Sequence, residues 1–359
     1  MQRRTPRATL EDVAAAAGVS RTSASRALLG QRKVTPETVR KVQAAAERLG
    51  YVPNTAAKLL AGGSGNPFVG MVVRDSINPA YAELNLEVQV AARAADQQLI
   101  TMAVENDILP DMAARVIESM LGLGARGLMV AAGGIPSEML ERFSRVIPLV
   151  RAGSPEPSPE VASVEYDEAW HGRHIAEQVI AHGHRHVAIV SKSQAESPPQ
   201  HLRAEAMSAT FAENGVRVER FENERGDLAD PHTDMGNGNS ATSPTAQVGP
   251  RPRVDQALDS VERGVTAIVC AADFWAIDVL AGAPVRELRV PQDVSVTGID
   301  GCMPGLEVMG LTTIRLPVAR LAATAVDTLV QVIEHPELRP KLKLRGDLVP
   351  GSSLADPRL

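Results

Sequence analysis

The sequence predicts an α/β protein with a small all-α head followed by a larger body built on parallel β-sheets. In the head, residues typical of helix caps bound three short helices. From Phe68 onward, short apolar runs alternate with longer helical stretches, which is the pattern of βαβ units. The 359 residues are enough for about two to three domains of roughly 100–200 residues each.

The first two helices of the head are predicted from their ends. Thr9 can cap the first helix, with Asp12 three residues later in capping-box spacing, and Gly18 can end it. Ser20 can cap a second helix over Arg21–Leu28. The connection between the two is so short that only a tight helix–helix turn fits.

A third helix is predicted to begin at Thr35-Pro36-Glu37, with proline at the first helical position, and to end at Gly50. Apolar residues at helical spacing supply a small core for the three helices. These residues are Val13, Val19, Ala24, Leu28, Val39, Val42 and Leu49.

Charge distinguishes the head from the body. The whole chain has a formal net charge of −6. Residues 1–62 carry 11 Lys and Arg against four Asp and Glu, a net charge of +7, whereas the remaining residues carry 26 against 39, a net charge of −13. A basic head on an acidic body fits polyanion binding. A solvated charged surface is the alternative interpretation of the charge alone.

Several motifs of the head closely resemble the lac/galactose repressor family of bacterial transcription regulators. The matching segments are Thr9-Leu-Glu-Asp-Val-Ala-Ala-Ala-Ala-Gly-Val-Ser20, Ser25-Arg26-Ala27-Leu28, Val34-Thr35, Gly50-Tyr51-Val52-Pro53-Asn54 and Leu60-Ala61-Gly62. The resemblance implies a helix-turn-helix domain over residues 1–53 whose second helix enters the major groove of double-stranded DNA.

The resemblance also assigns DNA contacts. Arg21 and Thr22 match the main specificity positions, with Arg26 beside them, and arginine can bond guanine at two atoms. The hydroxyl residues match positions that chiefly contact phosphate or fix register, and simple helix capping is their alternative role. The full set of expected contacts is Thr9, Ser20, Arg21, Thr22, Ser23, Ser25, Arg26, Lys33, Thr35, Tyr51, Asn54, Ala57 and Leu60.

Residues 54–66 are expected to form a hinge helix and a linker. Residues 54–61 are too short for a stable free helix, and the resemblance implies that they fold on the operator, paired with the dimer mate. Leu60 matches a leucine wedged between base pairs in the minor groove. Packing of Leu60 on the body is the alternative. The Gly- and Ser-rich residues 62–67 then form a flexible linker.

The body contains two sets of alternating elements. The predicted strands are Phe68–Val73, Leu99–Val104, Gly127–Ala131, Ile147–Val150, Val187–Val190, Ala267–Ala271 and Val294–Ile299. The predicted helices are Tyr81–Gln97, Pro110–Leu123, Pro136–Arg145, Glu168–His182, Arg203–Asn214 and Trp275–Ala283. The two sets resemble the paired Rossmann-like parallel sheets of periplasmic-binding-protein-like cores, which the repressor family uses.

That resemblance implies an effector-binding and dimerisation core over residues 67–359. The chain would cross between lobes near Val164, Leu316 and Gly346. The N-lobe would comprise residues 67–164 and 317–346, and the C-lobe residues 165–316 and 347–359. Ligands would sit between the lobes, at the carboxyl ends of strands.

Polar residues at the strand ends match the family's effector contacts. Carboxylates facing an arginine would bind sugar hydroxyls, with Tyr81 as a stacking face. The alternatives are turn chemistry for Asn78 and Asp300 and helix capping for Asp273. The expected effector-binding set is Asp75, Asn78, Tyr81, Arg203, Asp227, Asp273 and Asp300.

Three departures from the family pattern lower the polarity of the predicted pocket. Ala272 replaces a common asparagine, Leu316 replaces a usual glutamine, and Arg151 stands where an aspartate is frequent. In addition, residues 230–252 form a low-complexity stretch that is predicted to be a disordered insertion. A standard hexose is therefore a doubtful effector.

Other functional classes find little support in the residues. Two cysteines, Cys270 and Cys302, are too few for a disulfide framework or a zinc ribbon. The alternating histidines at 182, 184 and 186 lack zinc spacing, and no catalytic or phosphate-loop motif occurs. We therefore expect no enzyme activity, no cofactor, no metal and no membrane partner, and a cytoplasmic location.

The sequence thus predicts a sequence-specific DNA-binding transcription regulator, with repression as the expected mode. It would bind a palindromic operator as a homodimer and respond to a small-molecule effector, a sugar or related metabolite. A regulator with a degenerate pocket that answers to a protein partner is the first alternative. A solute-binding protein is the second, although it would have no use for the basic head.

Overall fold

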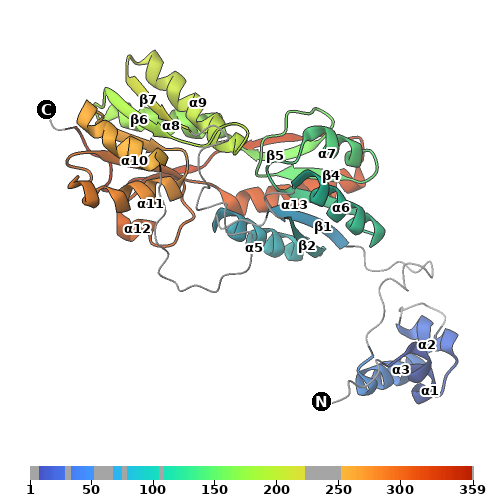
Figure 1. Ribbon diagram of the computed structural model, residues 1–359. Helices are drawn as coiled ribbons and strands as arrows, with labels where there is room; N and C mark the ends of the chain where they lie inside the picture. Colours follow the sequence, from blue (N-terminus) through green and yellow to red (C-terminus); the bar gives the residue numbers. More distant parts are fainter. Residues whose placement is uncertain are drawn as a thin grey trace. The chain divides into compact units, whose positions relative to one another are not determined.

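The computed structural model describes residues 8–28, 34–51, 68–74, 79–104, 109–222 and 252–357. The chain divides into two compact units, Met1–Pro67 and Phe68–Leu359. Each unit has its own hydrophobic core, and each is described by itself (Figure 1). Within the described ranges, no helix combines the length and the apolar character needed to cross a bilayer.

The head consists of three helices, α1 (Leu10–Ala17), α2 (Arg21–Leu28) and α3 (Pro36–Leu49). The predicted caps are confirmed. Thr9 and Asp12 form a reciprocal capping box on α1, and the Thr35 side chain accepts a hydrogen bond from the backbone of α3. Gly18 and Gly50 end α1 and α3 in the left-handed conformation, with φ of 65° and 62°, which glycine adopts without strain.

The core of the head is small and rich in alanine. Val13, Ala24 and Val42 are buried as predicted. The prediction for Leu49 is wrong: its side chain is 38% exposed, because it lies in the last turn of α3 and outside the contact between the three helices. The fully buried residues of this core are Val13, Ala14, Ala24, Ala27, Val42, Ala45 and Ala46.

The first lobe of the larger unit is built on a six-stranded sheet. Its strands are β1 (Phe68–Arg74), β2 (Gln98–Val104), β3 (Gly127–Ala131), β4 (Leu149–Ala152), β5 (Ala162–Tyr166) and β11 (Lys341–Leu344). They lie in the order β11-β5-β4-β3-β1-β2 and all pair in parallel. Alternate residues face opposite sides, so Met71 joins one core cluster and Val72 the other.

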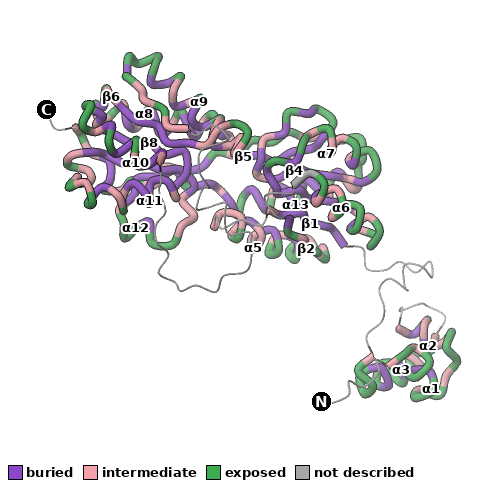
Figure 2. The backbone as a smooth tube through the Cα atoms, viewed as in Figure 1, coloured by how far each residue is buried: buried purple, intermediate pink, exposed green. Residues whose placement is uncertain are grey.

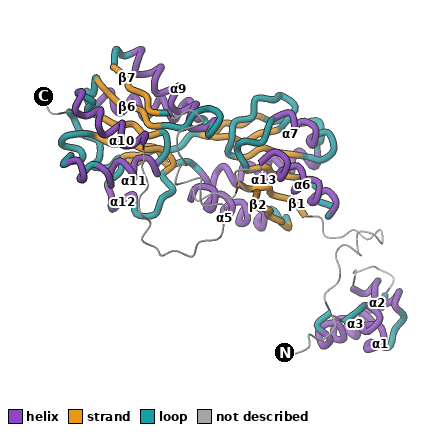
Figure 3. Tube along the Cα trace, viewed as in Figure 1, coloured by secondary structure: helices purple, strands orange, loops and turns teal. Residues whose placement is uncertain are grey.

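Helices cover both faces of this sheet, as a parallel sheet requires. Helices α5 (Pro79–Ala94) and α13 (Val318–Glu334) supply buried residues to one face, and α6 (Leu109–Gly122) and α7 (Ser137–Ser144) to the other. Figure 3 shows these helices around the strands. In the sequence, α13 follows most of the second lobe, yet it packs against α5 and the strands of the first sheet. Residues near the C-terminal end of the chain therefore complete the first lobe.

The second lobe repeats this plan with a second six-stranded sheet. Its strands are β6 (His186–Val190), β7 (Arg217–Phe221), β8 (Ala267–Cys270), β9 (Ser295–Asp300), β10 (Thr312–Arg315) and β12 (Asp347–Val349), in the order β12-β10-β9-β8-β6-β7. Helices α8 (Glu168–Ala181) and α9 (Pro198–Glu213) supply one face, and α10 (Pro252–Asp259) and α11 (Asp273–Gly282) the other. A short helix, α12 (Leu306–Met309), follows β9.

The sheets differ from the prediction at their edges and, in β5 and β10, one strand inside the edge. β12 pairs antiparallel with β10, although the apolar pattern predicted parallel sheets throughout. The sequence analysis also missed β5, β7, β10, β11 and β12. Strands such as β7 and β11 carry charged residues and are partly exposed, so they show no continuous apolar run.

The chain passes between the two sheets at three places. The first lies after Tyr166, because β5 ends there in the first sheet and α8 belongs to the second lobe, a little later than the expected crossing near Val164. The second lies at Leu316, between β10 and α13, and the third at Gly346, between β11 and β12. The buried residues concentrate on the two sheets (Figure 2).

Candidate functional site

The head presents one polar face of α2 to solvent. Arg21, Thr22 and Arg26 are exposed, whereas Ala24 and Ala27 are buried against α1 and α3. This division follows the helical period, because residues three and four positions apart share a face, as Thr22 and Arg26 do on one side and Ala24 and Ala27 on the other. The outward face of α2 therefore offers two guanidinium groups and a hydroxyl to a partner.

Among the described residues, Arg21 pairs with one surface carboxylate. Its Nε lies 2.9 Å from Oε1 of Glu11 in α1, and the two side chains are 70% and 61% exposed. Such exposed pairs contribute little free energy. Arg21 can consequently exchange Glu11 for another hydrogen-bond acceptor at small cost.

The other expected DNA contacts of the described part of the head already have structural roles. The Ser20 hydroxyl accepts the Ser23 N–H at 3.1 Å, and the Thr35 hydroxyl accepts the Thr38 N–H at 3.3 Å. Tyr51 packs against the head core, and Ser25 is half-buried on α2. Lys33, Asn54, Ala57 and Leu60 lie outside the described residues.

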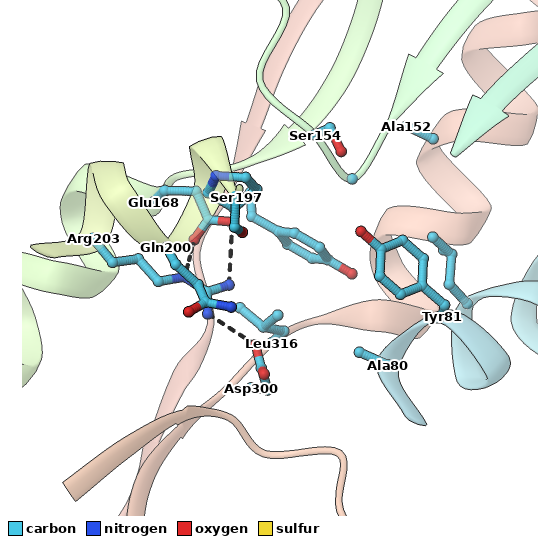
Figure 4. Close-up of a pocket in the computed structure, with 14 residues that line it drawn as sticks. Ala80, Tyr81, Ala152, Ser154, Glu168, Ser197, Gln200, Arg203, Asp300 and Leu316 are labelled. Carbon is cyan, nitrogen blue, oxygen red and sulfur yellow. Dashed lines mark hydrogen bonds and ion pairs between the residues drawn. The ribbon is translucent and has the colours of Figure 1, made fainter. Parts of the chain in front are cut away.

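A pocket lies between the two lobes of the larger unit. The space among its lining residues is about 550 Å³, a value that includes the part open to solvent. Of the expected effector contacts, Tyr81, Arg203 and Asp300 line it (Figure 4). The described lining residues are Ala80, Tyr81, Leu84, Ala152, Gly153, Ser154, Tyr166, Glu168, Ser197, Pro199, Gln200, Arg203, Asp300 and Leu316. Asp75, Asn78, Asp227 and the proposed insertion up to residue 251 lie outside the described residues.

A close contact between α8 and α9 sets one wall of this pocket. A Cβ added at Gly172 would lie 2.2 Å from the carbonyl oxygen of Arg203, so only glycine allows the two helices to approach this closely. The approach brings the Arg203 side chain of α9 to Glu168 at the first turn of α8.

Arg203 is buried, with 4% of its surface exposed, and bridges two carboxylates. Its Nε donates to Glu168 Oε2 at 2.6 Å, and one terminal nitrogen donates to Asp300 Oδ1 at 2.9 Å. Burial alone raises the pKa of the Glu168 carboxyl, but Arg203 and His171 outweigh it, so that pKa lies below its ordinary value. Glu168 is therefore ionised at neutral pH.

Asp300 has a strained backbone at the end of β9. Its φ is +142°, a conformation that side-chain-bearing residues rarely adopt. Its carbonyl oxygen accepts the Leu316 N–H at 2.9 Å, which ties β9 to the second crossing between the lobes. Strain of about 1–3 kcal/mol is typical of residues held for function.

Asp273 does not line the pocket, and its carboxylate does not cap its own helix. It is fully buried at the first residue of α11, where its two oxygens accept the Gly301 N–H and the Thr313 hydroxyl, each at 2.6 Å. Burial and the nearby Asp300 carboxylate raise the pKa of Asp273 to about 7. Asp273 thus fixes the ends of β9 and β10, so its position at a strand end serves a structural contact.

Five polar residues of the pocket were missed from the sequence, namely Ser154, Tyr166, Glu168, Ser197 and Gln200. Gln200 lies one turn before Arg203 on α9, and that spacing could have indicated a shared face. Glu168 follows the helix-capping Asp167, and its position suggested only a favourable helix start. Arg151, one of the departures from the family pattern, pairs instead with Glu156 at 2.9 Å in a buried contact outside the pocket. Within the described ranges, no group of His, Cys, Asp and Glu side chains is arranged to hold a metal ion.

Comparisons with known proteins agree with this architecture. Residues 9–54 match the family of bacterial regulatory proteins called the lacI family, and residues 176–354 match a periplasmic binding protein-like domain. Catabolite control protein A of Priestia megaterium is 28% identical over 325 residues, which cover 90% of this chain and 92% of that protein. The ribose operon repressor of Escherichia coli (strain K12) is 26% identical over 337 residues, covering 92% and 95%.

Solved structures share the fold. The lac repressor dimer bound to operator and the anti-inducer ONPF aligns with a TM-score of 0.77 and 22% identity, over 98% of this chain and 100% of that chain. The complex of the transcriptional regulator CelR with cellobiose aligns with a TM-score of 0.61 and 24% identity, over 97% and 100%. Head, lobes and relatives together make the chain similar over nearly its whole length to bacterial transcriptional regulators, and its head matches the lacI family of bacterial regulatory proteins.

Proposed function

We propose that the protein is a cytoplasmic repressor that binds a palindromic operator as a homodimer and responds to a small-molecule effector between its lobes. The observation that carries this proposal is the outward face of α2, where Arg21, Thr22 and Arg26 are exposed while the opposite face forms the head core. A recognition helix in the major groove requires this arrangement of side chains.

The effector in this proposal is a sugar or a related metabolite. The pocket offers hydroxyl, amide and carboxylate groups beside the rings of Tyr81 and Tyr166, a combination that suits hydroxyl-rich ligands. Relatives and neighbours of the chain include a ribose operon repressor and a cellobiose complex, which supports the class without naming the compound.

The homodimer is supported by an apolar stripe on α5. Leu86 and Val90 lie one turn apart on this helix and are 58% and 56% exposed. Exposed apolar residues at this spacing favour packing against a second helix. A symmetric pair would present two heads to the two halves of a palindrome.

Coupling between effector and operator follows from the position of the pocket. Its lining residues come from α5 and β4 in the first lobe and from α8, α9 and β9 in the second, so a ligand changes the preferred separation of the lobes. We propose that this change alters the α5 surface of the dimer and, through it, the hinge residues. By reciprocity, the operator changes effector affinity by the same factor.

The proposal is tested by incubating the purified full-length protein with fragmented genomic DNA and sequencing the bound fragments. A truncated chain of residues 63–359 serves as control, because the core is a compact unit of its own. A palindromic motif that disappears with the head would support the proposal. Absence of any enriched motif, also after cell extract is added to supply a corepressor, would contradict it.

A further inference from the structure

Almost all the hydrogen-bond donors of the Arg203 guanidinium bond to other groups of the protein. An arginine side chain has five N–H donors. Nε and one terminal nitrogen bond the two oxygens of Glu168 at 2.6 and 3.2 Å, and the other terminal nitrogen bonds Asp300 Oδ1 at 2.9 Å and the carbonyl of Ala271 at 2.8 Å. One N–H is left for a ligand.

Glu168 is fixed in this position from its other side. His171 Nδ1 lies 3.3 Å from Glu168 Oε2, and His171 Nε2 accepts the Gly346 N–H at 2.9 Å. Because Nε2 accepts, Nδ1 carries the proton and donates to Glu168. Gly346 lies at the third crossing between the lobes, so the backbone there orients His171, and His171 orients the carboxylate that covers Arg203.

The charge of the pocket follows from this network. Arg203 is the one cation among its described lining residues, and it faces two carboxylates, Glu168 and Asp300. A guanidinium binds a phosphate or carboxylate ligand most strongly through two parallel N–H donors on one face. Here Glu168 occupies that face, and an anion entering the pocket would meet two negative groups for one positive group.

We propose that Glu168 sets the charge class of the effector, so that the pocket admits uncharged, hydroxyl-rich molecules and excludes phosphorylated or carboxylated ones. This inference rests on the proposed effector site between the lobes. It makes Glu168 a specificity-determining residue, with His171 as the residue that positions it. Uncharged ligands can instead bond Ser154, Ser197 and Gln200, which also line the pocket.

The test uses inorganic phosphate as the probe, because its outcome does not depend on knowing the effector. Phosphate binding to the full-length protein is measured by isothermal titration calorimetry at constant ionic strength, for wild type and Glu168→Gln. Glu168→Gln removes the charge but keeps the shape, so we expect it to bind phosphate at least about tenfold more tightly than wild type. A second substitution, Arg203→Met, should abolish this gain.

A matched control is available in the same unit. Arg151 and Glu156 also form a buried pair, at 2.9 Å, and neither lines the pocket. Glu156→Gln should lose stability without gaining phosphate binding. A gain equal to that of Glu168→Gln would show a general effect of lost negative charge and would overturn the proposal.

The wild-type protein supplies a second measurement that needs no variant to fold. Ribose is compared with ribose 5-phosphate, and cellobiose with its phosphate ester, in thermal-shift titrations. Tighter binding of the phosphorylated member of either pair would overturn the proposal. The genomic DNA experiment tests the regulatory function independently, so failure of one does not imply failure of the other.

Discussion

Replacing Asp273 with asparagine should remove a pH-dependent cost to the stability of the second lobe. The folded protein holds the pKa of this carboxyl at about 7, against an ordinary value of 3.8, because the group is buried and lies near Asp300. Between these two pH values the folded chain binds a proton that the unfolded chain has lost. The contribution of Asp273 to the free energy of unfolding of wild type therefore falls as pH rises from about 4 to about 7 and then stays level.

The magnitude follows from the shift in pKa. A change from 3.8 to about 7 corresponds to at most about 4 kcal/mol at ~1.4 kcal/mol per pKa unit. Asparagine has no such titration and keeps both hydrogen bonds, since its oxygen can accept the Gly301 N–H and its amide can donate to the Thr313 hydroxyl. The stability of Asp273→Asn relative to wild type should thus increase across this window.

Urea unfolding at several pH values, followed by tryptophan fluorescence, measures this difference. Both tryptophans of the chain, Trp170 and Trp275, lie in α8 and α11 of the second lobe and report on the affected region. Thr313→Val removes a hydrogen bond that lowers the pKa of Asp273, so the window should extend to higher pH in that variant. An equal difference between Asp273→Asn and wild type at about pH 5 and about pH 8 would refute the reasoning.

Three further predictions concern the head, the dimer and the wall of the pocket. Arg21→Ala should lose about 1–3 kcal/mol of discrimination at one base-pair position, whereas Lys33→Ala should weaken binding to all DNA sequences alike and reduce the salt dependence of binding. Selection from random DNA at two salt concentrations distinguishes the two variants. A uniform loss of affinity in both would contradict the docking of α2 in the major groove. Leu86→Glu combined with Val90→Glu should convert the proposed dimer to monomers in sedimentation velocity, because both exposed side chains lie on one stripe of α5. A dimer that survives both substitutions would place the interface elsewhere. Gly172→Ala should lower stability by about 1–3 kcal/mol, because its Cβ would lie 2.2 Å from the Arg203 carbonyl oxygen. Gly122→Ala in α6 has nothing within 4 Å of the added Cβ and should be neutral or stabilising. Equal shifts of the unfolding temperature in the two variants would show that the close contact at Gly172 does not affect stability.

The sequence predicted those features that depend on residues close to one another along the chain. The three helices of the head were predictable because Thr9, Ser20 and Thr35 bond the backbone within three residues, and Gly18 and Gly50 end helices by their own conformation. The central strands were predictable because burial on both faces requires continuous apolar runs. Edge strands such as β11 were not predicted because they lack such a run: β11 alternates lysine with leucine and is largely exposed.

The site was only partly predictable. Tyr81, Arg203 and Asp300 were expected in the pocket through resemblance to a known family, and they line it. The partnership of Arg203 with Glu168 joins residues 35 positions apart, and that of Asp273 with Gly301 joins residues 28 positions apart. No local pattern encodes such contacts.

By itself, then, the amino-acid order determined the helix caps, the alternation of strands and helices, and the separation of a basic head from an acidic body. Which carboxylate faces the pocket and which is buried behind it was decided by the tertiary structure. The physical reason is that the close contact at Gly172 and the strained turn at Asp300 bring distant side chains within bonding distance. Once Glu168 and Asp300 lie against Arg203, burial strengthens every charge interaction among them, and the properties of the pocket follow from that arrangement.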